Sequence, residues 1–178
     1  GENKGGIKSA VKLLDTVCSQ TNKVDSARHC ALFGGQIDKD VKTFNIEKWQ
    51  QVLTVSVEGL SYKICSLPGV FNHGSLDLGT QLLLENLPEV KSGRVLDFGS
   101  GAGVIGCFIG LKNSASKIVM SDVSALAIYC SQQSAKLNEL EVEVLASNGL
   151  ASVTGKFSTI VTNPPFHTGI QTDYSVTE

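Results

Sequence analysis

From residue 94 onward, short apolar runs alternate with stretches of helical length, and this alternation limits the possible folds more than any other feature. A helix is expected at 104–112, and Ser124 is a good N-cap for another that runs to about Leu137. Strands that alternate with helices predict parallel βαβ units and a sheet buried on both faces. The expected strands are RVLDF (94–98), KIVMSD (117–122), VEVLAS (142–147) and FSTIVTN (157–163).

The carboxyl ends of these strands carry polar residues, namely Asp97, Asp122, Ser147 and Asn163. Open parallel sheets bind ligands beyond the carboxyl ends of their strands. We therefore expect these four side chains to lie along one edge of the sheet, at a ligand site.

The first half of the chain has a different pattern. Residues 5–17 have apolar positions at helical spacing and predict an amphipathic surface helix. Residues 50–57 and 60–66 alternate around Glu58-Gly59, which predicts an antiparallel hairpin. A short helix is expected at 79–87, before Pro88.

Composition excludes several classes of protein. Apolar residues make up 42% and charged residues 18%, and no apolar run approaches the length of a membrane span. The five cysteines are widely spaced without a C-x-x-C pair, which favours reduced thiols in a cytoplasmic protein and argues against a metal site. The net charge of −2 is evenly spread, so no basic block indicates nucleic-acid binding, and composition alone argues mildly against an RNA partner.

The loop after the first strand, Asp97-Phe98-Gly99-Ser100-Gly101-Ala102-Gly103, permits two interpretations. Gly101 to Gly106 satisfy the dinucleotide pattern G-x-G-x-x-G, and Asp122 lies about 20 residues further on, where a ribose-binding acid belongs. Asp97, however, would place negative charge beside the site, which suits an ammonium or sulfonium ligand better than a pyrophosphate. In that form the loop resembles the motif of S-adenosylmethionine (SAM) dependent methyltransferases, in which Asp122 would bind the ribose.

Asn163-Pro164-Pro165-Phe166 favours the second interpretation. An amine conjugated to a base ring is a poor nucleophile, so acceptors must hold it in line with the bond that breaks. The Asn163 side chain and the Pro164 carbonyl can provide those acceptors. Prolines stiffen the segment, and the Phe166 ring offers a face on which a base can stack.

This quartet matches the Asn-Pro-Pro-aromatic signature of amino-group methyltransferases, and the chain as a whole resembles the ribosomal RNA small subunit methyltransferase C family. The resemblance covers NPPFHTGIQT (163–172), GVFNHGSLDLGTQLLL (69–84), VLDFGSGAGVIG (95–106), SDVSALAI (121–128), ASNGL (146–150) and VDSARHCALF (24–33).

The resemblance implies a Rossmann-like class I SAM-dependent methyltransferase fold, preceded by part of a degenerate methyltransferase-like domain. Residues 1–66 would be the end of that first domain and a hairpin linker, and residues 67–178 the catalytic domain. Met120 is the only methionine, and only four of the usual seven strands can be placed after residue 94. We therefore expect a fragment that lacks the start of the first domain and the end of the second.

The resemblance also implies methylation of the exocyclic N2 amine of a guanine in small-subunit (16S) ribosomal RNA, by a monomeric cytoplasmic enzyme. Alternatives are a large-subunit rRNA methyltransferase, an NAD(P)-binding oxidoreductase and a non-catalytic RNA-binding or assembly module. The expected catalytic residues are Asn163, Pro164, Pro165 and Phe166. The expected SAM-binding residues are Asp97, Gly99, Gly101, Gly103, Asp122, Asn148, Asp77 and Thr80.

Several of these residues also have simpler interpretations. Asp97 and Asp77 could cap helices, and Asp122 could be an acid at a helix start. Asn148-Gly149 is also a common turn pair. His167 is expected to be exposed rather than catalytic, because methyl transfer to an amine needs no strong base.

Overall fold

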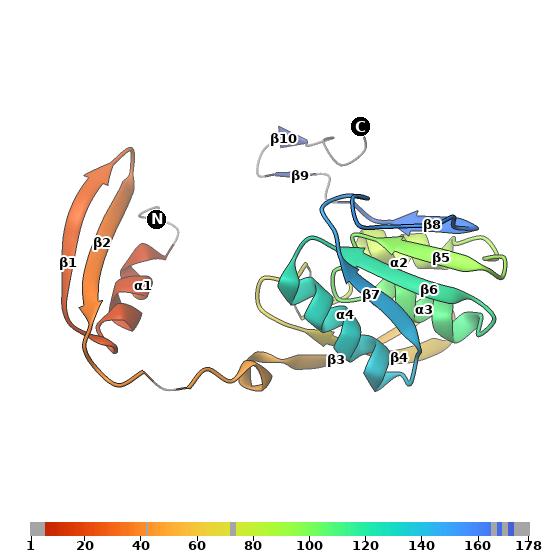
Figure 1. Ribbon diagram of the computed structural model, residues 1–178, viewed down its shortest axis with the longest axis horizontal. Helices are drawn as coiled ribbons and strands as arrows, with labels where there is room; N and C mark the ends of the chain where they lie inside the picture. The colour runs from red at the N-terminus through yellow and green to blue at the C-terminus, as the bar shows by residue number, and fades with distance from the viewer. Residues whose placement is uncertain (1–5, 42, 72–73, 165–166, 169–170, 173–178) are drawn as a thin grey trace. The chain divides into compact units, whose positions relative to one another are not determined.

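The computed structural model describes residues 6–41, 43–71, 74–164, 167–168 and 171–172 (Figure 1). The chain divides into two compact units, residues 1–45 and residues 46–178, and each is described by itself. Within the described ranges, no helix is both long and apolar enough to cross a bilayer.

The first unit consists of α1 (Ile7–Leu14) and a hairpin of β1 (Cys18–Ala27) and β2 (Cys30–Ile37). The helix confirms the prediction from its apolar spacing. The hairpin was not predicted, because its turn residues Arg28 and His29 are not typical turn formers, although both have positive φ (46° and 62°). Two-residue turns of this kind normally carry Asn or Gly.

The second unit begins with the short 3₁₀ helix η1 (Ile46–Trp49) and the hairpin of β3 (Gln51–Val57) and β4 (Leu60–Ser66). This hairpin was predicted, and Glu58 and Gly59 form its turn with φ of 52° and 74°. The hairpin falls in the second unit, whereas the sequence grouped it, as a linker, with the end of the first domain. The domain boundary at residue 66 stays a prediction.

The predicted parallel sheet is confirmed. Its strands are β5 (Arg94–Phe98), β6 (Lys117–Asp122), β7 (Val142–Ala146) and β8 (Thr159–Thr162), in the order β7-β6-β5-β8. The helices are α2 (Leu78–Glu85), α3 (Val104–Lys112) and α4 (Ala125–Leu137), the last capped by Ser124 as expected. Two short strands, β9 (His167–Thr168) and β10 (Gln171–Thr172), pair with each other.

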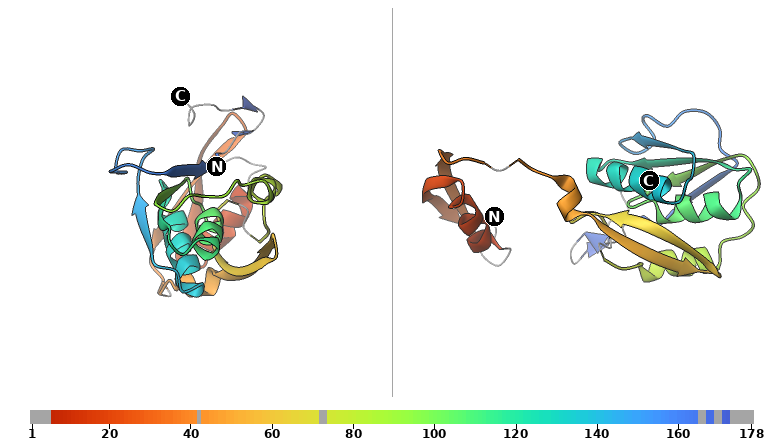
Figure 2. Two further views of the ribbon diagram at one scale, coloured as in Figure 1. Left: turned by 90° about the vertical axis from the view of Figure 1, so that its right-hand side faces the viewer. Right: turned by 90° about the horizontal axis from the view of Figure 1, so that it is seen from below.

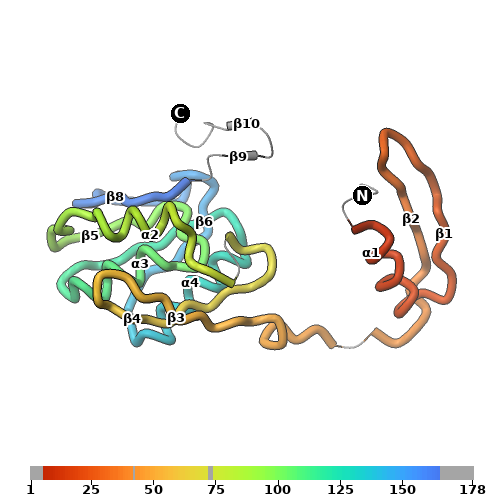
Figure 3. The backbone as a smooth tube through the Cα atoms, turned by 180° about the vertical axis from the view of Figure 1, so that it is seen from behind, coloured from red at the N-terminus to blue at the C-terminus, as the bar shows by residue number. Residues whose placement is uncertain are grey.

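Helices α3 and α4 pack on one face of the sheet, and the β3–β4 hairpin lies against these helices on their far side (Figures 2 and 3). Val95 and Leu96 point to opposite faces of the central strand β5, and both are fully buried. Ile160 on β8 is 57% exposed. The central strands are therefore buried on both faces as predicted, whereas β8 is not.

Close packing between α3 and the sheet fixes the position of the loop that precedes the helix. A Cβ atom on Gly106 would lie 3.0 Å from Cγ of Met120 and 3.1 Å from Oδ2 of Asp97, so the absence of a side chain helps α3 to approach β6 this closely. The Tyr62 hydroxyl donates to the Val104 carbonyl at 3.2 Å and thereby ties the hairpin to the start of α3. The tilted ring pair of Tyr62 and Phe108 adds to this contact.

Candidate functional site

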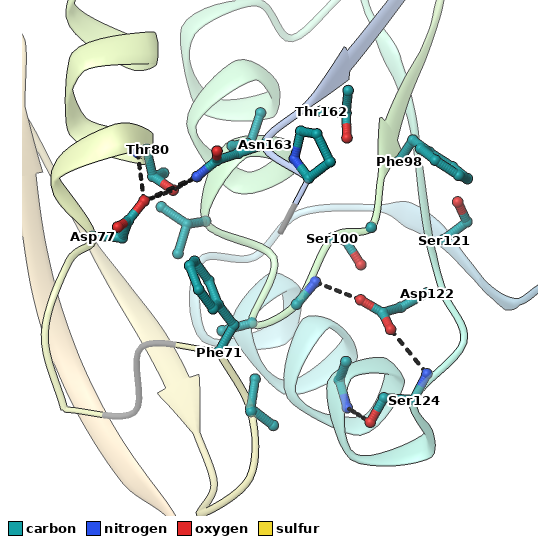
Figure 4. Close-up of a pocket in the computed structure, with 18 of the residues that line it drawn as sticks. Phe71, Asp77, Thr80, Phe98, Ser100, Ser121, Asp122, Ser124, Thr162 and Asn163 are labelled. Atoms are coloured by element: carbon teal, nitrogen blue, oxygen red, sulfur yellow. Dashed lines mark hydrogen bonds between the residues drawn. The ribbon is translucent and has the colours of Figure 1, made fainter. Parts of the chain in front are cut away.

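A cavity of about 580 Å³ opens at the carboxyl edge of the sheet, a size typical of sites for small molecules (Figure 4). Three of the four predicted strand-end residues line it, namely Asp122, Ser147 and Asn163, and Asp97 does not. The rest of the wall comes from the hairpin, residues 69–80 and the glycine loop. The predicted ligand edge is therefore a real cavity.

The three loop glycines have different surroundings. All have positive φ (72° at Gly99, 55° at Gly101 and 80° at Gly103), and the first two line the cavity. Gly103 does not, and a Cβ atom there would lie 3.1 Å from Cα of Ser131 on α4. Gly99 and Gly101 therefore shape the cavity, whereas Gly103 lets α3 pack on α4.

The N–H groups of this loop are largely occupied within the protein. Those of Gly99 and Ser100 donate to the Ser121 carbonyl at 2.8 and 2.9 Å, and that of Gly101 donates to Oδ2 of Asp122 at 2.9 Å. A pyrophosphate needs free N–H donors at such a loop. Here a carboxylate takes one of them and adds negative charge, which disfavours the dinucleotide interpretation.

Asp122 lies at the end of β6 and lines the cavity. Its Oδ2 accepts from Gly101 N, and its Oδ1 accepts from Ser124 N at 2.8 Å. Each carboxylate oxygen can accept a second hydrogen bond. Asp122 therefore acts as an acid at the start of α4, as the simpler interpretation predicted. Its carboxylate oxygens can still accept hydrogen bonds from a ligand.

Asp97 is fully buried beneath the loop rather than beside the cavity. Its Oδ2 accepts from Gly106 N at 2.8 Å, and its Oδ1 has no hydrogen-bond partner within the described residues. Burial raises the pKa of Asp97 to about 7; the hydrogen bond from Gly106 opposes this rise, and the charge of Asp122 adds to it. The position of Asp97 fits a residue that supports the loop better than one that contacts a cofactor.

Asn163 follows β8, and its amide contacts two residues from the start of α2 (Figure 4). Its Nδ2 lies 2.9 Å from Oδ2 of Asp77 and 2.9 Å from Oγ1 of Thr80. Asp77 also caps α2 by accepting from Thr80 N at 2.8 Å. Pro164 lines the same cavity, whereas the predicted residues Pro165 and Phe166 lie outside the described residues.

The turn after β7 forms another part of the wall. Asn148 lines the cavity and is exposed, and Gly149 has a φ of 57°, so the turn interpretation of this pair holds. Ser147 stabilises the turn, because its hydroxyl donates to the Gly149 carbonyl and accepts from Ser152 N. Asn148 can therefore be a turn residue and still face a ligand.

Two buried serines on α4 support the loop, and sequence reasoning missed them. The Ser131 hydroxyl donates to the Gly101 carbonyl at 3.0 Å, and the Ser134 hydroxyl donates to the Ala102 carbonyl at 2.7 Å. Ser134 also accepts from Cys65 N on β4 at 2.9 Å. The available signal was their spacing of three residues, which places both on the same helix face.

In the described part of the chain, no three His, Cys, Asp or Glu side chains gather closely enough to hold an ion. The polar groups around the cavity are oxygens of Asp, Ser, Thr and Asn together with backbone groups. Such a wall suits an organic ligand with hydroxyl and amino groups.

Curated relatives match the whole chain. A protein of Pseudoalteromonas atlantica is 64% identical over 178 residues, and one of Pseudoalteromonas translucida is 53% identical. Both bear the name ribosomal RNA small subunit methyltransferase C, which confirms the resemblance inferred from the motifs. The chain spans 52% of the length of each, so it corresponds to about half of these relatives.

A solved structure shares the fold. The 16S rRNA N2 methyltransferase RsmC of T. thermophilus, in complex with AdoMet and guanosine, superimposes with a TM-score of 0.86 at 25% identity. The match covers 95% of this chain and 47% of that one. The predicted class I methyltransferase fold is therefore confirmed.

Family models agree with both halves of the chain. The methyltransferase small domain N-terminal model matches residues 1–52, and the methyltransferase small domain model matches residues 61–178. The second match covers nearly all of strand β4, the parallel sheet and every residue that lines the cavity except Leu53 and Val55. The chain therefore belongs to the methyltransferase small domain family.

Proposed function

We propose that the protein containing this chain transfers the methyl group of SAM to the exocyclic N2 amine of a guanine in small-subunit ribosomal RNA. The observation that carries the proposal is a single cavity that joins the glycine loop and Asp122 to Asn163 and Pro164. The names of the relatives and the AdoMet and guanosine bound to the T. thermophilus protein support the same activity.

The cofactor would lie against Gly99 and Gly101, with its ribose hydroxyls donating to Asp122. When bound, SAM supplies a methyl group on a positively charged sulfur. The negative charge of Asp122 suits a cationic ligand, and Asn148 lies at the same cavity for a base edge. Gly103 and Asp97 would act indirectly, through the packing of α3 and the support of the loop.

The acceptor amine would be held by Oδ1 of Asn163 and the Pro164 carbonyl. A guanine amine has its lone pair delocalised into the ring, and two acceptors on its protons would orient it for in-line attack. In the proposed transfer, N2 would bond to the methyl carbon as the carbon–sulfur bond breaks, and the amine would then lose a proton to solvent. Stacking by Phe166 and stiffening by Pro165 remain predictions from the sequence.

The test uses the full-length protein, labelled SAM and separated ribosomal subunits. We expect labelled methylguanosine in small-subunit RNA. Asn163→Ala removes one acceptor for the amine and is expected to slow transfer by roughly tenfold to a hundredfold, because a lost acceptor costs about 1–3 kcal/mol. A variant that keeps the wild-type rate would contradict the orienting role of Asn163.

The same experiment separates the alternatives. Label in large-subunit RNA would identify the other rRNA methyltransferase class, and binding of either subunit without label would indicate an assembly module. Calorimetric titration with SAM and with NADH separates the oxidoreductase, and we expect heat of binding with SAM alone.

We also propose that the enzyme is a monomer in the cytoplasm, where ribosomal subunits are its substrate. Light scattering on the full-length protein tests the oligomeric state. A mass of twice the chain mass would contradict the monomer.

A further inference from the structure

The amide group of Asn163 has its orientation fixed by two residues that the sequence had assigned to the cofactor. Oδ2 of Asp77 accepts from the backbone N–H of Thr80 at 2.8 Å, so this oxygen acts as an acceptor. It also lies 2.9 Å from the Asn163 amide. Only the NH₂ end of that amide can face it favourably.

The Nδ2 atom of Asn163 faces both partners, at 2.9 Å from Asp77 Oδ2 and 2.9 Å from Thr80 Oγ1. The Thr80 hydroxyl in turn donates to Asp77 Oδ2 at 3.2 Å. The three side chains therefore form a closed ring of hydrogen bonds, and Asn163 Oδ1 receives none from the described residues.

We propose that Asp77 and Thr80 are positioning residues, which hold Asn163 with Oδ1 toward the substrate amine. This inference rests on the proposed methyl transfer and assigns the two residues a different role from cofactor binding. A rotated amide would present NH₂ to the amine, donor against donor, and would bring Oδ1 against the Asp77 carboxylate. In Figure 4, Asp77 and Thr80 lie beside Asn163, whereas Asp122 lies on another part of the cavity wall.

Gly79 leaves room for the contact between Asp77 and Asn163. A Cβ atom at Gly79 would lie 3.1 Å from Asp77 Oδ2 and 3.6 Å from Asn163 Nδ2. Contacts of 3.1 Å are tighter than a carboxylate oxygen and a methyl group normally make. Gly79→Ala should therefore push Asp77 away from Asn163.

Two pairs of variants test the ring in full-length protein. Thr80→Val removes the hydroxyl at nearly constant shape, and Thr80→Ser restores it. Asp77→Ser keeps a helix cap but is too short to reach Asn163, whereas Asp77→Asn keeps an acceptor oxygen. We expect Thr80→Val and Asp77→Ser to lower kcat by about tenfold with the Kd for SAM unchanged, and the paired variants to retain most activity.

A cofactor role would give the opposite result. If the Kd for SAM rises while kcat at saturating SAM stays at the wild-type value, Asp77 and Thr80 bind the cofactor and the inference is wrong. In an Asn163→Ala background, Thr80→Val should have no further effect on kcat. Independent, multiplying losses would also overturn the inference.

An NMR measurement separates this inference from the proposed function. The side-chain NH₂ signals of Asn163 should be protected from hydrogen exchange in the wild type and lose protection in Thr80→Val, whatever the substrate. Protection without methyl transfer to guanine would leave the ring intact and refute the proposed function. Unprotected NH₂ signals in an active wild-type enzyme would refute the ring alone.

Discussion

Asp97 shows how a single side chain can differ from its predicted position. The sequence placed it at a strand end beside the ligand, but side chains alternate along a strand. Its neighbour Phe98 lines the cavity, and Asp97 points beneath α3 to Gly106 N. Tertiary packing decides which face of the sheet the last side chains of a strand point to. The sequence could therefore predict the carboxyl edge of the sheet, but not that Asp97 points away from the cavity.

The buried carboxyl group makes stability depend on pH. The pKa of Asp97 is raised from 3.8 to about 7, so the folded state binds more protons than the unfolded state between these values. Stability should therefore fall as pH rises from about 4 to about 7. The Asn side chain in Asp97→Asn cannot ionise. The free energy of unfolding of this variant, relative to the wild type, should therefore increase by roughly 2 kcal/mol as pH rises from 5 to 8.

Urea unfolding of both proteins across this pH range, without added ligand, measures the difference. The charge of Asp97 also raises the pKa values of Tyr62 and Cys107, but both groups titrate above this pH range, so the difference isolates Asp97. A difference that stays constant with pH would show that Asp97 is ionised throughout.

Gly101 and Gly103 should respond differently to alanine. Both have positive φ, which costs an alanine roughly 1 kcal/mol. A Cβ atom at Gly101 meets nothing within 4 Å, but one at Gly103 meets Ser131 Cα at 3.1 Å. We expect Gly103→Ala to lower the melting temperature more, and Gly101→Ala to weaken SAM binding more. Equal effects on both quantities would contradict the division of roles within the loop.

Among the elements, the parallel sheet, its helices and the β3–β4 hairpin followed from apolar periodicity and turn residues. The β1–β2 hairpin did not, because Arg28 and His29 adopt positive φ without the residues that usually allow it. A sequence pattern predicts a helix or strand correctly where the conformational preferences of the residues agree with the tertiary structure. The contacts of Asn163 with α2 were equally hidden, since they join residues 83 and 86 positions apart in sequence.

Helix α4 is the element through which the glycine loop is supported, and Ser134 is the residue to remove. Ser134→Ala would leave the Ala102 carbonyl and Cys65 N–H without their partner, both in the buried interior. Each unpaired group costs about 1–3 kcal/mol, so we expect a loss of at least about 2 kcal/mol in unfolding free energy. Gln132→Ala on the exposed side of α4 is the control, and an equal effect in both variants would refute the support role.

At the scale of the whole second unit, the serine contacts connect parts of the chain that are distant in sequence. Ser134 joins Cys65 in the hairpin to Ala102 in the loop, and Ser131 joins Gly101. The glycine loop and the hairpin, which both line the cavity, are thus also connected through hydrogen bonds of α4. A ligand that restrains the loop must also restrain the hairpin.

Occupancy of the cavity should therefore be measurable at a backbone group of a residue that does not itself line the cavity. The Cys65 amide, held by Ser134 Oγ, is expected to exchange its hydrogen more slowly when SAM is bound, and Ser134→Ala should abolish that response. Unchanged exchange at Cys65 in the bound state would show that the two layers open independently. The Cys65 amide, in a residue that does not line the cavity, would otherwise serve as an intrinsic sensor of whether the enzyme carries its methyl donor.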